Sequence, residues 1–332
     1  MATLLTLSPS TVSKALSDST EISEPTKQRV KDLAKACGYV PNKMARNLKL
    51  GRTRSIGVVI PNVVDEFFGM VLQGIEKEAS KNNYSVVICI SDDKSRKEEM
   101  GLAALINGSV DGILISAAKE SQRKQRFEYL RNIMLQYGIP VVQFDRVYDE
   151  LDSDKVCIDD FDGAYIATKH LIETGCKRIA FLSPIFETSV GKKRKNGYLH
   201  ALQLENGSYI PILLNIKNYE GFEGLVGQAV QYHQIDGILA ADELSGVYAM
   251  NIIHSLGLKV PNDVSVIGFT NGKMAQCANP PLTTVSQRAS DIGKFAIGTL
   301  INRIEDDSGE LPKEKVLKTK LLIRKSTKSS VN

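Results

Sequence analysis

The chain has 332 residues, of which 42% are hydrophobic and 24% are charged, and its net charge is +4. This length exceeds that of one compact core, so we expect two or three globular domains. No apolar run approaches the roughly 18 residues of a membrane span, and the start MATLLTLSPS lacks the basic and apolar regions of a signal peptide. The five cysteines are scattered without a CxxC pair, which favours reduced thiols over disulfides or a metal site. We therefore expect a cytoplasmic protein with no membrane partner.

Charge is unevenly distributed along the chain. Residues 1–54 contain ten Lys or Arg and four Asp or Glu, a net charge of +6, whereas the remaining residues contain 32 and 34, a net charge of −2. A small basic head on a nearly neutral body is typical of a protein with a polyanion partner. A basic, solvated chain end without a partner is the alternative that charge alone leaves open.

The first 40 residues carry signals for three short helices. MATLL is expected to end the first, and a second over residues 8–16 begins with Ser8 as N-cap and Pro9 at the first helical position. Its apolar positions Val12, Ala15 and Leu16 share one face. The opposite face carries hydroxyls and one cation, which suit base edges and phosphates in a major groove: Ser10, Ser13, Lys14 and Ser17.

The third helix, EPTKQRVKDLAKACG, follows Ser23 as N-cap and stops at Gly38. Two short helices joined by a tight turn and supported by a third describe a helix-turn-helix. After it, Asn42 could cap a helix of about two turns that ends at Gly51, with Ala45 and Leu48 on its exposed side. Such a helix is marginal alone in water and is expected to order only when something holds it.

From residue 55 onward, short β-branched runs alternate with helical stretches. The predicted strands lie in SIGVVI, YSVVICI, DGILIS, IPVVQF, KRIAFLS, DGILAA and DVSVIGF. Strands that alternate with helices predict an α/β body of two doubly wound parallel-sheet subdomains. We expect a head over 1–40, a hinge helix and linker over 41–53, and a core over 54–325 followed by a polar tail over 326–332. The first subdomain would comprise about 54–155 plus 286–313, and the second about 156–285 plus 314–325.

Ligands of such folds bind beyond the carboxyl ends of the strands, here in the cleft between the two halves. Carboxylate, guanidinium, amide, hydroxyl and aromatic side chains that suit a sugar follow these strands or begin helices near them: Phe68, Asp145, Arg146, Arg194, Asp242, Thr270 and Asn271. Asp145 and Arg146 could instead form a structural ion pair, and Phe68 could be ordinary core.

Several segments together resemble the LacI/GalR family of transcriptional repressors: SPSTVSKAL, ISEPTKQRVKDLAKACGYVPNKMARNLKLGRTRSIGVVIP, VPNDVSVIGF and PPLTTVSQ. The resemblance runs in register to about residue 325. It implies that the head binds an operator through recognition-helix residues beginning at Ser8 (Ser10, Thr11, Ser13 and Lys14), and through Asn42, Ala45 and Leu48 of a hinge helix. Leu48 would wedge into the minor groove; its alternative role is a hydrophobe covering the junction between head and body.

The resemblance also implies a homodimer and a sugar or sugar derivative as effector, in a cleft lined at Asp145, Arg194, Thr270 and Asn271. The chain departs from the family at two points. It starts about eight residues into the usual first helix, so either its start lies upstream or the head is destabilised. It also has GFTN where the family usually has GFDD, so the family does not identify the sugar.

Enzyme motifs are missing from the sequence, which contains no GxGxxG after a strand, GxxxxGK[ST], HExxH or GxSxG. We therefore expect no catalytic residues, no cofactor and no metal. The sequence predicts a ligand-responsive repressor that binds a pseudo-palindromic operator as a dimer. The alternative is a solute-binding protein without DNA-binding activity, which would have no use for residues 1–52.

Overall fold

The computed structural model describes residues 1–39, 52–108, 110–205, 207–216, 221–305 and 311–329. The chain divides into two compact units, Met1–Thr53 and Arg54–Asn332, which we call the head and the body. Within the described residues, no helix is long and apolar enough to cross a bilayer. The predicted hinge residues Asn42, Ala45 and Leu48 lie outside the described residues.

The head consists of three helices around a small apolar core, as predicted. They are α1 (Ala2–Leu5), α2 (Pro9–Leu16) and α3 (Glu24–Ala36). Val12 and Ala15 of α2 are buried against Val30 of α3, which confirms the predicted inner face. The chain leaves α3 through Gly38, whose φ of +60° is a left-handed conformation that glycine adopts without strain.

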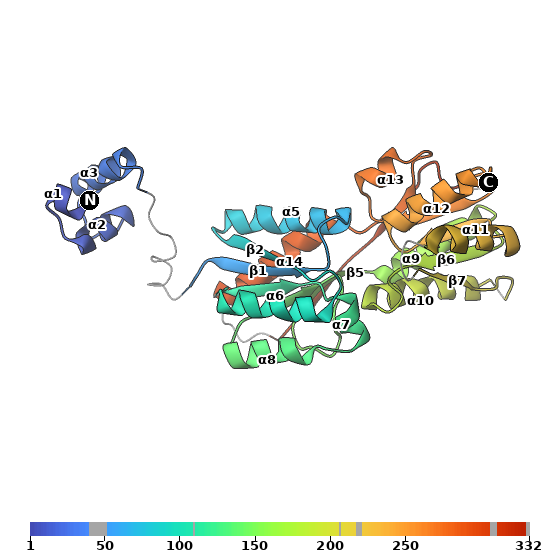
Figure 1. Ribbon diagram of the computed structural model, residues 1–332, viewed down its shortest axis with the longest axis horizontal. Coiled ribbons are helices and arrows are strands. Elements are labelled where there is room, and N and C mark those ends of the chain that lie inside the picture. The colour runs from blue at the N-terminus through green and yellow to red at the C-terminus, as the bar shows by residue number, and fades with distance from the viewer. Residues whose placement is uncertain (40–51, 109, 206, 217–220, 306–310, 330–332) are drawn as a thin grey trace. The chain divides into compact units, whose positions relative to one another are not determined.

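The body contains two six-stranded sheets, each with helices on both faces (Figure 1). The first sheet has the strand order β11-β5-β4-β3-β1-β2, and every neighbouring pair in it is parallel. Its strands are β1 (Ser55–Ile60), β2 (Ser85–Ile90), β3 (Gly112–Ile115), β4 (Val141–Phe144), β5 (Asp154–Ile158) and β11 (Glu314–Leu317). Its helices are α5 (Glu66–Lys81), α6 (Ser95–Asn107), α7 (Lys119–Arg123), α8 (Glu128–Tyr137) and α14 (Ala289–Glu305).

The second sheet has the order β12-β10-β9-β8-β6-β7 and is parallel except for the pairing of β10 with β12. Its strands are β6 (Ile179–Ser183), β7 (Ile212–Asn215), β8 (Gly237–Ala240), β9 (Ser265–Phe269), β10 (Thr283–Ser286) and β12 (Lys320–Leu322). Its helices are α9 (Asp160–Glu173), α10 (Ser189–Gln203), α11 (Phe222–Tyr232), α12 (Glu243–Ser255) and α13 (Lys273–Cys277). The body therefore has the predicted α/β architecture of two doubly wound subdomains.

Apolar layers lie on both faces of each sheet. In the first subdomain, α5 and α14 bury side chains against one face, and α6 and α8 cover the other. In the second, α11 and α12 cover one face, and α9 and α10 the other. Because both faces are buried, the central strands are continuous apolar runs such as IAFLS and GILA.

The chain crosses between the subdomains three times, after Ile158, Ser286 and Leu317. The predicted divisions at 155 and 313 fall too early, because β5 and β11 pair with each other and complete the first sheet. The predicted polar tail also starts too early. Ser326 is fully buried, and its hydroxyl donates to the Val266 carbonyl and accepts from the Thr283 amide, at 2.6 and 2.7 Å.

Candidate functional site

In the head, helix α2 presents a polar face to solvent. Ser8 is its N-cap, and the Ser8 hydroxyl accepts a hydrogen bond from the Thr11 amide at 3.0 Å. Ser10 and Ser13 are exposed, and Thr11 is half-buried. This face offers short hydrogen-bonding groups on a rigid element, as major-groove contacts require.

Lys14, the cation of this face, is paired with Glu21 just beyond the helix. Its side chain is 40% exposed, and the Glu21 carboxylate is 64% exposed. An ion pair between groups this exposed stabilises little. Lys14 can therefore exchange Glu21 for a phosphate at low free-energy cost.

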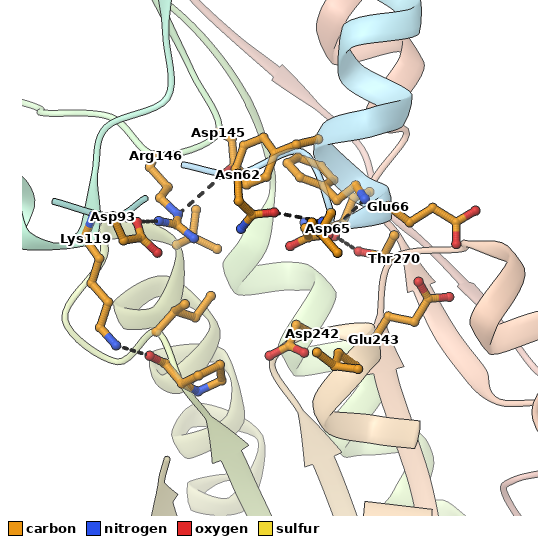
Figure 2. A pocket seen from close by; sticks show the side chains of 18 of the residues that line it. Asn62, Asp65, Glu66, Asp93, Lys119, Asp145, Arg146, Asp242, Glu243 and Thr270 are labelled. Atoms are coloured by element: carbon orange, nitrogen blue, oxygen red, sulfur yellow. Dashed lines mark hydrogen bonds and ion pairs between the residues drawn. The ribbon is translucent and has the colours of Figure 1, made fainter. Parts of the chain in front are cut away.

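The body contains a cavity of about 460 Å³ between its two subdomains (Figure 2). Six of the seven predicted ligand-binding residues line it: Phe68, Asp145, Arg146, Arg194, Asp242 and Thr270. They converge because β4, α5, α10, α12 and β9 all begin or end at the edges where the two sheets face each other. This size and mixed lining are typical of a small-molecule site.

Asn271 does not line this cavity. It lines a smaller neighbouring cavity near the start of α14, and its side-chain oxygen accepts a hydrogen bond from Arg324. Thr270, next to it, is 3% exposed, and its hydroxyl donates to the Gln287 side chain. The hydroxyl oxygen of Thr270 thus keeps lone pairs to offer a ligand.

Arg194 is held in a fixed position at the cavity wall. Its Nε donates to Asp160 at 2.7 Å, its Nη1 donates to the Ala241 carbonyl at 2.5 Å, and its guanidinium lies 3.9 Å from the centre of the Phe269 ring. The residue is only 2% exposed, and its Nη2 atom is buried without a hydrogen-bond partner. A buried guanidinium N–H with no acceptor is costly, so this atom is suited to a ligand oxygen.

Asp145 and Arg146 do not form the close structural pair that the sequence left open. Arg146 Nε lies 4.0 Å from the Asp145 carboxylate, whereas Arg146 Nη1 donates to Asp93 at 2.5 Å. Asp145 instead accepts from the Ser116 hydroxyl at 3.5 Å. Burial raises the pKa of Asp145 to about 7 against the opposing effect of Arg146, so this carboxyl is partly protonated at neutral pH.

Sequence reasoning missed several cavity residues that come from loops and helix starts of the first subdomain. Among them are Asn62, Asp65, Glu66, Asp93 and Lys119. Asp65 carried a local signal, because it is the N-cap of α5 and accepts from the Phe67 amide at 2.9 Å. Asp93 and Lys119 follow β2 and β3 at the same sheet edge as Asp145. The order of the strands, once known, would therefore have predicted that both residues line the cavity.

Polar contacts beside the cavity join the two subdomains. Gln122 of α7 donates to the Ser189 hydroxyl at 3.2 Å and accepts from the Ser189 amide at 3.1 Å. Lys119 donates to the Pro184 carbonyl, and Glu66 accepts from the Lys273 amide at 2.8 Å. Hydrogen bonds from loops and helix starts therefore link the two subdomains.

Comparisons with known proteins match both units. A sequence model for bacterial regulatory proteins of the lacI family matches residues 2–42, and one for a periplasmic binding protein-like domain matches residues 168–327. The sucrose operon repressor of Pediococcus pentosaceus is 31% identical over 329 residues, covering 97% of this chain and 96% of its own.

Among solved structures, a LacI family transcriptional regulator from Enterococcus faecium with bound ribose is similar to this chain, with a TM-score of 0.73 and 26% identity over 84% of this chain and 100% of its own. The lac repressor dimer bound to operator and an anti-inducer has a TM-score of 0.85 at 20% identity, over 99% of this chain and 98% of its own. At that identity the likeness is evidence for the fold alone.

Proposed function

The chain belongs to the lacI family of bacterial regulatory proteins and is a DNA-binding transcriptional regulator; we propose that it represses genes of carbohydrate use by holding an operator. The observation that carries this is the three-helix head, whose helix α2 exposes Ser10 and Ser13 on a unit with a net charge of +6 over residues 1–54. We expect the protein to act in the cytoplasm, where operator DNA lies, and through binding alone, without catalysis.

In this proposal, the head supplies two kinds of contact. The basic residues attract the duplex without regard to sequence, and this attraction weakens as salt rises. Ser10, Thr11, Ser13 and Lys14 contact bases or phosphates from α2, which is capped by Ser8. Asn42, Ala45 and Leu48 would form the hinge helix, with Leu48 as the minor-groove wedge.

The body supplies the response to a small molecule. We propose that a sugar or sugar derivative binds in the 460 Å³ cavity, with Arg194, Asp145 and Asp242 as hydrogen-bonding groups and Phe68 as an apolar wall. Similar proteins support this class, since one is a sucrose operon repressor and another was solved with bound ribose. Ligand closure would change the angle between the subdomains and thereby the spacing of the hinge segments.

We propose that two protomers pair through their bodies, so that two heads meet two half-sites of one operator. The edge strand β2 supports this arrangement. Its side chains Val87, Ile88 and Ile90 are 44%, 45% and 42% exposed, an apolar edge that a lone molecule would leave in water.

The alternative of a solute-binding protein accounts for the cavity but not for the lacI-family match over residues 2–42. A gel-shift with DNA from upstream of the gene, at 50 and 200 mM salt, tests the proposal. We expect a shift that weakens steeply with salt and a footprint of two half-sites. Absence of a shift at the lower salt concentration would contradict DNA binding by this chain.

A further inference from the structure

The lining of the cavity is strongly acidic. Six carboxylates line it, Asp65, Glu66, Asp93, Asp145, Asp242 and Glu243, against three basic side chains, Lys119, Arg146 and Arg194. Asp160, which pairs with Arg194, is a further carboxylate behind this wall. In a low-dielectric space, an excess of one sign favours ligands of the other sign and rejects ligands of the same sign.

The basic groups of the cavity are already engaged. Arg146 is paired with Asp93 at 2.5 Å, and Arg194 with Asp160 at 2.7 Å. Lys119 donates to the backbone carbonyl of Pro184. An anionic ligand that took Arg194 away from Asp160 would leave a buried carboxylate unpaired, and one that took Arg146 would compete with Asp93, whose side chain is 34% exposed.

The acidic groups, in contrast, are held mainly by neutral donors. Asp65 accepts from the Phe67 amide at 2.9 Å, and Asp242 accepts from the amide and the hydroxyl of Ser245, both at 2.7 Å. Glu66 and Glu243 accept from backbone amides near the start of α13, at 2.8 and 2.7 Å. Over the described part of the chain, these four carboxylates form no ion pair.

These carboxylates also face one another across the cavity. Figure 2 shows Asp65 and Glu66 entering from the first subdomain and Asp242 and Glu243 from the second. Burial raises the pKa of Asp242 and Glu243, and neighbouring carboxylates raise each pKa further. Their negative charge is thus incompletely compensated by the protein.

A second feature shows what else the ligand must offer. Arg194 Nη2 is an unpartnered donor on a residue that is 2% exposed and lines the same cavity. A hydroxyl oxygen satisfies it without adding negative charge, and the hydroxyl proton can be donated to a carboxylate. Among the described residues, no group of three or more His, Cys, Asp or Glu is placed to hold a metal ion.

We propose that the effector carries a positive charge, as an amine on a hydroxylated skeleton of the amino-sugar class, and carries no phosphate or carboxylate. The ammonium group lies between Asp65 and Asp242, and hydroxyls meet Arg194 Nη2 and Thr270. This inference rests on the proposed function, because it assigns a ligand class to the same cavity.

The test is a binding panel on the full chain, by thermal shift and calorimetry at low salt. The panel contains glucose, galactose and mannose, each as the free sugar, the 2-amino-2-deoxy sugar, its N-acetyl derivative and the 6-phosphate. N-acetylation removes the charge and keeps the skeleton. We expect at least one amine to bind, at least about tenfold more tightly than its neutral and N-acetyl counterparts, a difference of about 1.4 kcal/mol. The proposal would be overturned if no amino sugar in the panel bound, or if a sugar phosphate bound as tightly as the amine.

Variants of the two facing carboxylates localise the effect. Asp65→Asn and Asp242→Asn remove one charge each but keep a good N-cap on α5 and α12. Each is expected to weaken binding of the amine about tenfold more than it weakens binding of the N-acetyl derivative, because only the amine loses an ion pair. The matched control is Asp159→Asn, which removes a charge at the N-cap of α9 from a residue that does not line the cavity. Unchanged amine affinity in both cavity variants would refute the assignment.

The gel-shift separates failure of this inference from failure of the proposed function. If a neutral sugar or a phosphate binds the cavity and changes operator affinity, the regulator function stands and the amine class is wrong. If an amine binds as predicted but operator affinity does not change, the ligand class stands and the proposed response to a ligand fails.

Discussion

Arg194 and Asp160 form a buried ion pair whose side chains are 3% and 2% exposed. Removing the guanidinium leaves the Asp160 carboxylate buried without a cation. We expect Arg194→Met to lower the free energy of unfolding by about 3–5 kcal/mol, and the double variant with Asp160→Asn to recover part of this loss. Urea unfolding of the body measures both.

The control for this prediction is Arg288→Met. Arg288 pairs with Asp291 at 2.9 Å, but both side chains are 44% exposed, so its loss should cost less than about 1 kcal/mol. Equal effects of the two arginine variants would show that Arg194 has no special structural role.

Asp145 makes stability depend on pH. Burial raises its pKa from 3.8 to about 7, so between these values the folded state binds a proton that the unfolded state has lost. The free energy of unfolding therefore falls as pH rises through this window. Asp145→Asn removes this contribution. As pH rises from about 4 to about 7, the free energy of unfolding of the variant should therefore increase by a few kcal/mol relative to that of the native protein.

Urea unfolding of both proteins at pH 4.5, 6 and 8 checks the prediction. Carboxyls that do not interact with Asp145 titrate equally in both proteins and cancel in the difference, whereas Asp160 and Asp65 interact with it. A difference in unfolding free energy that stays constant with pH would show that Asp145 is ionised throughout.

The sequence predicted those cavity residues that directly follow a predicted strand or begin a predicted helix. Asp145 and Asp242 were found because each stands at the end of an apolar run, β4 and β8. Asp93 and Lys119 were missed because their position beside Arg146 depends on the packing of β2, β3 and β4 in one sheet. A charge excess in the cavity is a property of the assembled fold that no single segment contains.

At the scale of the element, the Ser8 cap stabilises the first turn of α2, from which Ser10 and Thr11 project. The Ser8 hydroxyl accepts from a backbone amide of α2, whereas the Ser23 hydroxyl of α3 contacts only the Thr26 hydroxyl, at 3.0 Å. Ser8→Ala should cost about 1 kcal/mol, and Ser23→Ala less.

Hydrogen exchange of the head amides in the full chain measures this difference. We expect protection in α2 to fall about fivefold in Ser8→Ala. Equal losses of protection in α2 for Ser8→Ala and in α3 for Ser23→Ala would contradict the capping role that we assign to Ser8.

Helices α5 and α14 approach each other closely through glycines. A Cβ at Gly293 of α14 would lie 2.1 Å from the Val71 carbonyl oxygen of α5. Gly293→Ala must push the helices apart and should cost about 1–3 kcal/mol. Gly298→Ala on the same helix meets nothing within 4 Å and should stabilise by up to about 1 kcal/mol. Thermal unfolding that ranks the two variants in the opposite order would contradict this packing.

The structure contains all seven predicted strands. Five further strands among the described residues were not predicted from the sequence: β5, β7, β10, β11 and β12. The first of these, DKVCI, has a charged start, and EKVL of β11 is mostly exposed, so neither is a continuous apolar run. Both are strands because they pair with each other at the edge of the first sheet. Non-local pairing of this kind is invisible to a local pattern.

At the scale of the whole molecule, the body consists of two similar sheets joined by three crossings of the chain and by polar contacts beside a cavity. In our proposal the body has an open and a closed arrangement, and a ligand that binds the closed one shifts the population toward it. We propose that this shift is coupled to operator binding by the head.

Fluorescence anisotropy tests this coupling most directly, with the full chain titrated onto labelled operator in the presence and absence of a ligand that stabilises the body. We predict that saturating ligand changes operator affinity about 5- to 150-fold, and that operator changes ligand affinity by the same factor. A ligand that occupies the cavity and leaves operator affinity unchanged would contradict the account.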